Sequence, residues 1–236
     1  GEDKKAEGQM EEIKRQTNPG DPGRQTLGLI YLRKGKLDES ITELNLIVNA
    51  WPDDDKSRYY LASAYEEKGE HEKALEQFHK IKSGSEYYVN AGIHIAFILE
   101  NQGRSEEAIG ILEKAIQIEK EKAELYLMLS SIHENRKDYD RAIEAIERGL
   151  KVDGKNVELI FRMGAVLDKK GDKEKGIEQM RRILDVHPEH ADALNYIGYT
   201  YAEQGIRLEE AMGLIQKALK IKPDSGYIID SLGWVY

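Results

Sequence analysis

The side chains that could carry out chemistry are few, and none of them forms a complete site in the sequence. His187 and His190 flank Pro188-Glu189, and two histidines at this spacing could share a zinc ion. No third ligand lies near them in the sequence, so we interpret this segment as a solvated turn. The 236 residues include no cysteine, which removes thiolate metal sites, disulfides and cysteine nucleophiles. The sequence therefore predicts no metal site.

Motifs of enzymes are also lacking in the sequence. The glycines recur at wide spacing rather than in a cluster, so there is no glycine-rich loop to hold a phosphate. No serine stands in the strand-to-helix context of a nucleophile elbow. Adjacent acids such as Glu209-Glu210 are typical of the negatively charged start of a helix. We therefore expect neither catalysis nor a cofactor.

Charge and hydropathy argue against two further classes of partner. The chain carries 35 lysines and arginines against 44 acidic residues, a formal net charge of -9. This balance argues against nucleic acid, because phosphate binding relies on basic side chains. No apolar run approaches the ~20 residues that are needed to cross a bilayer. The chain opens and closes in the middle of its sequence pattern, so we expect it to be part of a longer protein, and its compartment stays undetermined.

Small residues that recur with one period reveal the elements that must position any site. One series, spaced by 34 residues with a last step of 35, comprises Ala6, Ser40, Ala74, Ala108, Ala142, Gly176 and Ala211. A parallel series comprises Gly28, Ala62, Ala96, Ser130, Gly164, Gly198 and Gly233. Short side chains allow paired helices to approach closely, so a large residue at Ala108 or Ala142 should cost ~1–3 kcal/mol. The period predicts a stacked array that presents a surface.

Each unit of the period has the pattern of a helix, a short turn and a second helix. In the unit from 25 to 52, Gly35 ends the first helix, Asp38 is a candidate cap for the second, and Pro52 closes the unit. The turn glycine recurs in the later units, with Lys137 as the exception, at Gly69, Gly103, Gly171 and Gly205. One extra residue lies between Gly205 and Ala211, where it either bulges the turn or lengthens a helix end.

These residues resemble the tetratricopeptide repeat (TPR) family. Its pattern of leucine-glycine, tyrosine, alanine, phenylalanine and closing proline is similar to Leu27-Gly28, Tyr31, Ser40, Leu44 and Pro52. The resemblance implies an all-α, right-handed α-solenoid of about six full repeats over residues 21–225. Residues 1–20 are then the second helix of a half repeat or a tail, and residues 226–236 the first helix of a truncated seventh repeat. We expect the apolar Leu232, Trp234, Val235 and Tyr236 of that helix to promote self-association.

The resemblance also implies a function, the binding of a protein or peptide partner in a concave groove lined by the first helix of each repeat. The positions that this implies for the groove are Leu29, Tyr59, Ser63, His94, Phe97, Asn101, Leu127, Ser131, Asn135, Phe161, Asn195 and Tyr199. Packing between neighbouring repeats is the alternative for the aromatic members. Acidic residues lie one turn further along, at Glu66, Glu67, Glu100, Glu134, Asp168 and Glu203, and favour a basic or mixed partner.

One comparison within the family argues against a partner that is held by its terminal carboxylate. Members that clamp a terminal carboxylate use lysine, asparagine and arginine on these helices, whereas this chain has Gln25, Leu29 and His94 at such positions.

The stretch from Asn195 to Tyr236 is similar to TPR proteins of bacterial envelopes. This similarity implies an adaptor in a bacterial multiprotein assembly. Its location would be the periplasm or the outer membrane, as a lipoprotein, or otherwise the cytoplasm. A recognition module of a larger enzyme or sensor and a helical-repeat RNA binder are the alternatives.

Overall fold

The computed structural model describes the backbone of residues 2–235 and the side chains of residues 8–235, and within this part it contains fourteen α-helices and no strand. The first seven are α1 (Glu2–Gln16), α2 (Pro22–Arg33), α3 (Leu37–Ala50), α4 (Asp55–Glu67), α5 (His71–His79), α6 (Tyr88–Asn101) and α7 (Ser105–Ile118). The others are α8 (Ala123–Asn135), α9 (Tyr139–Val152), α10 (Val157–Lys170), α11 (Lys173–Val186), α12 (Ala191–Glu203), α13 (Leu208–Ile221) and α14 (Gly226–Gly233). The predicted all-α class is confirmed.

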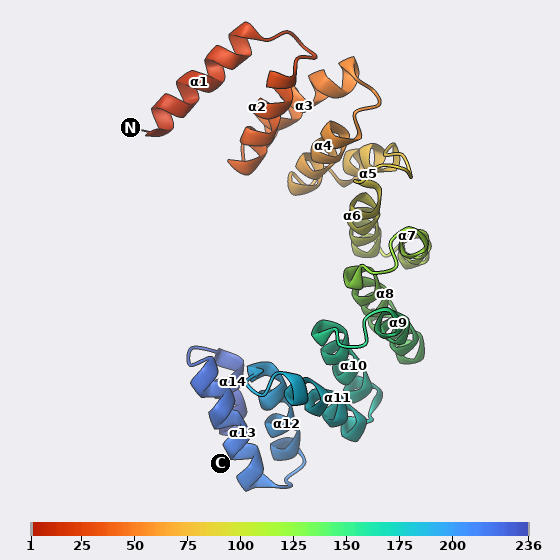
Figure 1. The fold of residues 1–236 in the computed structure, drawn as a ribbon, viewed down its shortest axis with the longest axis vertical. Coiled ribbons are helices and arrows are strands. Elements are labelled where there is room, and N and C mark those ends of the chain that lie inside the picture. The colour runs from red at the N-terminus through yellow and green to blue at the C-terminus, as the bar shows by residue number, and fades with distance from the viewer. Residues whose placement is uncertain (1, 236) are drawn as a thin grey trace. The chain divides into compact units, whose positions relative to one another are not determined.

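The helices form two compact units, Gly1–Ile118 and Glu119–Tyr236. Within each unit, consecutive helices lie side by side in chain order (Figure 1). The closest partners are the two helices of one repeat, such as α2 with α3 in the first unit and α10 with α11 in the second. First helices of successive repeats also touch, as α8 does α10 and α12 does α14. The predicted pattern of helix, turn and helix is therefore present in both units.

Small residues of the period such as Gly28 and Gly198 stand where two paired helices meet. A Cβ added to Gly28 would lie 2.6 Å from Cγ of Leu44, and the Ser40 hydroxyl donates a hydrogen bond to the Gly28 carbonyl at 2.8 Å. A Cβ on Gly198 would lie 2.7 Å from Cγ1 of Ile215 and 2.9 Å from the Ala211 carbonyl oxygen. Real Cβ contacts are not this short, so a larger side chain would separate the helices. At these positions the structure agrees with the steric reason given for the two series, whereas a Cβ on Gly233, the last member of its series, would meet no atom within 4 Å.

The predicted turn residues adopt the left-handed backbone conformation. Their φ angles are 68° at Gly35, 83° at Gly69, 74° at Gly103, 99° at Gly171 and 65° at Gly205. Lys137, the exception in the sequence, adopts the same conformation with φ 60°. Glycine is favoured here because it has no Cβ to clash with the following carbonyl oxygen. The turn geometry is therefore kept even where the sequence supplies a lysine.

The residues that cap the helix starts are predicted less well than the turn glycines. Asp38 does not cap α3, because the helix already begins at Leu37 and Lys36 occupies the cap position. The Asp38 carboxylate instead pairs with Lys68 at 2.7 Å. Side-chain caps are present at other starts, where Asp54 accepts from the Ser57 amide and Asn156 from the Leu159 amide. An aspartate near a helix start is thus a weaker signal than the glycine at a helix end.

Two local departures change the lengths of elements. Helix α5 has only 9 residues, whereas α7 and α9 have 14; it ends at His79, and the chain then passes through a turn at Ser83-Gly84 before α6 begins. The extra residue of the sixth repeat lies in the turn between α12 and α13. There Gly205 and Arg207 both adopt left-handed conformations, and α12 and α13 keep 13 and 14 residues. The insertion therefore bulges the turn and does not lengthen a helix.

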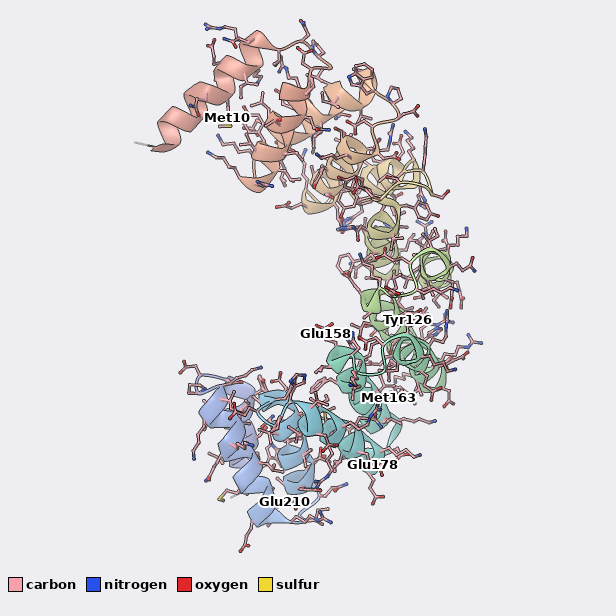
Figure 2. All side chains as sticks on the ribbon, viewed as in Figure 1. Met10, Tyr126, Glu158, Met163, Glu178 and Glu210 are labelled. Carbon is pink, nitrogen blue, oxygen red and sulfur yellow. The ribbon has the colours of Figure 1, made fainter. Side chains whose placement is uncertain are left out.

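The helices at the two ends of the chain pack as further members of the same pattern. Met10 of α1, labelled in Figure 2, is buried against Leu27 and Tyr31 of α2. Thirty-four residues later, Leu44 packs in the same way against Leu61, with Tyr65 beside it. This observation favours our interpretation of residues 1–20 as a half repeat, which stays a prediction. At the other end, Ile228 of α14 is fully buried in a core shared with α12 and α13.

Candidate functional site

In the first unit, two residues predicted for the groove contact each other. The Tyr59 hydroxyl and Nε2 of His94 are 3.0 Å apart, and Nδ1 of His94 lies 2.7 Å from the Glu66 carboxylate. The His94 ring also stacks on Phe78, with centroids 5.1 Å apart and planes 12° from parallel. Tyr59 further contacts the ring of Tyr87, which the short α5 brings within 5.3 Å. Tyr59 and His94 thus hold α4, α5 and α6 together. For these two residues the structure favours packing between neighbouring repeats over contact with a partner.

The other groove positions of the first unit differ in exposure. Phe97 is 50% exposed, and Asn101 is exposed one turn later on α6. Leu29 is half-buried on α2, and the hydroxyl of Ser63 donates to the Tyr59 carbonyl within α4 at 3.0 Å. Phe97 and Asn101 are therefore the predicted residues of this unit whose side chains are most open to a partner.

In the second unit, the predicted residues line two adjoining hollows. The first has a volume of about 540 Å³, and it is lined by Leu127, Val157, Glu158, Phe161, Arg162, Ala165, His190 and Asp192. Glu158 is seen at the start of α10 in Figure 2. Leu127 comes from α8, Phe161 from α10 and Asp192 from α12, so three first helices build the wall. Leu127 and Phe161 were predicted for the groove, and the structure places them together.

The second hollow, of about 460 Å³, shares Phe161 and Asp192 with the first and extends to α14. Its remaining lining residues are Asn195, Tyr196, Tyr199, Tyr227, Asp230, Ser231 and Trp234. Asn195 and Tyr199 were predicted for the groove. The rings of Tyr199 and Trp234 meet edge to face, with centroids 5.9 Å apart and planes at 81°. The other two predicted residues of this unit, Ser131 and Asn135, lie on α8 and line neither hollow.

The acidic side chains expected along the groove are partly neutralised in this unit. Glu134 pairs with Arg162 at 3.3 Å and also with Lys169, and Glu203 pairs with Lys173. Burial raises the pKa of Asp168, and the nearby Lys173 opposes this effect while Glu203 adds to it. The carboxylates that line the hollows are instead Glu158, Asp192 and Asp230. The negative lining is present, but other residues supply it than those expected.

Asp192 has a special place because it belongs to both hollows. Its carboxylate accepts hydrogen bonds from Lys222 at 2.8 and 2.9 Å and one from the Tyr227 hydroxyl. Burial acts to raise the pKa of Asp192, but these hydrogen bonds and the charge of Lys222 outweigh burial and lower it. Burial also raises the pKa of Tyr196, and the negative Asp168 and Glu203 strengthen that shift. Both side chains therefore keep one charge state at neutral pH, Asp192 ionised and Tyr196 neutral.

His187 and His190, the two candidate zinc ligands of the sequence, do not lie in a metal site. Nδ1 of His190 accepts a hydrogen bond from the Ala193 amide at 3.2 Å and so caps α12, while His187 is exposed. Residues 8–235 contain no group of three histidine or acidic side chains placed to hold a metal ion. His133 is buried, as expected for its position in the repeat. Among the helices described, none combines the length and the apolar composition that a membrane span requires.

Several lining residues were missed, and the period itself contains the signal for two of them. Leu127, Phe161 and Asn195 are 34 apart, and one more step, lengthened to 35 by the insertion, leads to Asp230. The same step leads from Tyr199 to Trp234. The predicted groove ends at the sixth repeat, whereas residues of α14 continue its wall.

The apolar side chains of α14 and of the two residues that follow it are only partly exposed. Trp234 is 59% exposed and Tyr227 51% exposed, but Leu232 and Val235 pack against the core shared by α12, α13 and α14. Leu232 and Val235 therefore do not leave the uncovered surface that we expected of them. Tyr236 lies outside the described residues. Self-association through this helix stays a prediction.

Comparison with known proteins agrees with the repeat. Sequence profiles of the tetratricopeptide repeat match residues 101–167 in one case and residues 26–86 and 161–226 in another, and the second alone covers more than half of the chain. A stretch of 48 residues is 50% identical to the TPR repeat-containing protein PA4667 of Pseudomonas aeruginosa. That match covers 20% of this chain and 8% of the relative, so the chain spans only a small part of its length.

Solved structures with low sequence identity share the fold. The C-terminal part of a TPR repeat-containing protein from Cytophaga hutchinsonii has a TM-score of 0.72 at 17% identity, covering 94% of this chain and 90% of that chain. YrrB, described as a TPR protein with an unusual peptide-binding site, has a TM-score of 0.56 at 22% identity, covering 80% and 96%. Together with the period of 34 and the paired helices, these matches show that the chain belongs to the tetratricopeptide repeat family.

Proposed function

We propose that this chain is a non-catalytic scaffold that binds a protein or peptide partner along the first helices of its repeats, as an adaptor in a bacterial multiprotein assembly. Family members are typically protein-interaction modules. The observation that carries the proposal is the pair of adjoining hollows in the second unit, which share Phe161 and Asp192. An extended peptide could place one side chain in each hollow and run over the shared wall.

The composition of these walls suits a ligand with both apolar and polar parts, such as a peptide. Both hollows are open, mostly apolar or aromatic, and carry a few polar groups that could fix the orientation of a chain. Tyrosine and tryptophan are also the residues that dominate binding energy in protein interfaces. The peptide-binding site described for YrrB, which shares the fold, is a further support.

The test is a selection of random 12-residue peptides on the immobilised protein, followed by fluorescence anisotropy with the enriched sequences. Phe161→Leu keeps most of the volume that packs on the core but removes the ring. We expect this change to weaken binding about twofold to tenfold, because aromatic pairs contribute roughly 0.5–1.5 kcal/mol beyond their buried area. Circular dichroism would verify that the variant is folded.

The matched control is Val152→Ala, since Val152 is exposed at the end of α9, a second helix of the same unit, and lines neither hollow. Peptide affinity should be unchanged in this variant. Failure to enrich any peptide, or enriched peptides that bind wild type and Phe161→Leu equally, would refute the proposed site.

A further inference from the structure

The hollow between α10, α12 and α14 has the lining of a cation site. Aromatic rings form much of its wall, and its charged members are the carboxylates of Asp192 and Asp230, with no basic side chain among the lining residues. Asp192 is already bound by Lys222, whereas Asp230 is exposed to solvent and forms no ion pair with any residue that the structure describes. One negative charge is thus left without a partner at the edge of an aromatic hollow.

Two rings that line this hollow, Tyr199 and Trp234, belong to the kind of side chain that binds cations on its faces. Tyr199 and Trp234 meet edge to face at 5.9 Å, which sets their two faces almost at right angles. A cation over such a face, within about 6 Å of the ring centroid, is attracted by the negative charge of the π system. Trp234 and Tyr227 are each more than half exposed, so a ligand can approach them from solvent.

An independent observation indicates that the ligand carries N–H donors. Asn195 lines this hollow and is only 7% exposed, and its Oδ1 has no hydrogen-bond partner within the described part of the chain. A buried amide oxygen is normally paired, so an unpaired one in the wall of a hollow fits a donor that arrives with the ligand. A quaternary ammonium group has no such donor.

We propose that this hollow binds an arginine side chain of the partner peptide, an inference that rests on the function proposed above. The guanidinium group is planar, stacks on aromatic faces, and carries five N–H donors that can serve Asp230 and Asn195 at once. Lysine offers a point charge without the planar face and binds more weakly here. Because Phe161 and Asp192 line both hollows, an arginine bound here is one anchor of a peptide that also fills the first hollow.

The probe for the test is N-acetyl-arginine-N-methylamide, and its neutral counterpart is the citrulline derivative of the same shape. The chain contains two tryptophans, so its nitrogen-15 spectrum has two indole signals, which Trp51→Phe assigns. The indole of Trp51 lies in the first unit, where it donates to the Gly20 carbonyl at 2.8 Å, and serves as an internal reference. We expect the arginine probe to shift the Trp234 signal saturably and the Trp51 signal not at all.

Charge dependence decides between a specific site and a merely sticky surface. The citrulline probe should bind at least about tenfold more weakly, and Asp230→Asn should weaken the arginine probe about fivefold, as expected for loss of a charge-assisted hydrogen bond. Asp224→Asn is the matched control, because Asp224 is exposed, precedes the same helix and does not line the hollow. Equal affinity for the arginine and citrulline probes, or no effect of Asp230→Asn, would overturn the inference.

The peptide selection separates this inference from the proposed function. Enriched peptides that need Phe161 but contain no arginine, and whose binding ignores Asp230→Asn, would overturn the arginine site and leave the peptide-binding function standing. Conversely, binding of the arginine probe that depends on Asp230, with no peptide enriched, would support the cation site and refute the peptide-binding function.

Discussion

The left-handed conformation of Lys137 makes Lys137→Gly a stabilising substitution. Lys137 has φ 60°, and the equivalent turns hold glycine, as at Gly103 with φ 74°. A non-glycine residue in this conformation costs about 1–2 kcal/mol. Glycine, in turn, loses about 0.4–1 kcal/mol because it widens the unfolded ensemble. The difference predicts that Lys137→Gly raises the free energy of unfolding by about 0.5–1 kcal/mol.

Urea unfolding followed by far-ultraviolet circular dichroism measures this difference. Lys137→Ala separates the backbone effect from the loss of the side chain, since alanine keeps the strain. The converse change, Gly103→Ala, should destabilise by about 1 kcal/mol. A Cβ at Gly103 meets no atom within 4 Å, so the backbone alone accounts for that loss. The reasoning is refuted if Lys137→Gly is no more stable than Lys137→Ala, or if Gly103→Ala has no effect.

Two further predictions concern glycine packing and acid sensitivity. Gly198→Ala should lower the free energy of unfolding by about 1–3 kcal/mol through overpacking. Gly213 lies in the exposed middle of α13, where an added Cβ would meet no atom within 4 Å, so Gly213→Ala should raise the free energy of unfolding by about 0.5–1 kcal/mol. Urea unfolding measures both changes. The lowered pKa of Asp192 stabilises the fold above the ordinary aspartate pKa of 3.8, and this contribution is lost as the pH falls through the folded-state pKa. The stability difference between wild type and Asp192→Asn should therefore be largest near pH 7 and shrink towards pH 3.

Each of these predictions has a matched control. The two glycine changes are the same chemical substitution on neighbouring helices, so an equal effect at both positions would contradict the packing argument. For Asp192, the control is Asp224→Asn, an exposed carboxylate without an ion pair in the described part of the chain. A stability difference for Asp192→Asn that stays constant from pH 7 to pH 3 would contradict the assigned cause.

The fold could be predicted from the sequence because the steric requirements of paired helices recur in every repeat. Gly28 and Gly198 stand where no Cβ fits, and the turn glycines stand where φ is positive, so each residue type has one local physical cause. Lys137 shows the strength of that pattern, since the turn keeps its conformation without glycine. Features with a single local cause can be read from one sequence.

The candidate site depended on longer-range packing and was predicted only in part. Leu127, Phe161 and Asn195 follow the period and line the hollows, and their role in binding a partner stays a prediction. Tyr59, by contrast, is drawn into contact with Tyr87 by the early end of α5, which no single repeat position reveals. Likewise Glu134 is neutralised by Arg162, a residue of the next repeat. Ion pairs between repeats combine positions that a consensus pattern treats separately.

The bulged turn between α12 and α13 offers a point for attaching a probe. Because the extra residue is confined to the turn, the lining residues on α12 and α14 keep their positions in the repeat. Ile206 in this turn is 44% exposed and lines neither hollow. Since the chain has no cysteine, Ile206→Cys would create a single thiol for a fluorophore or a surface linkage. A label attached at this turn would therefore lie outside the two hollows whose binding is to be measured.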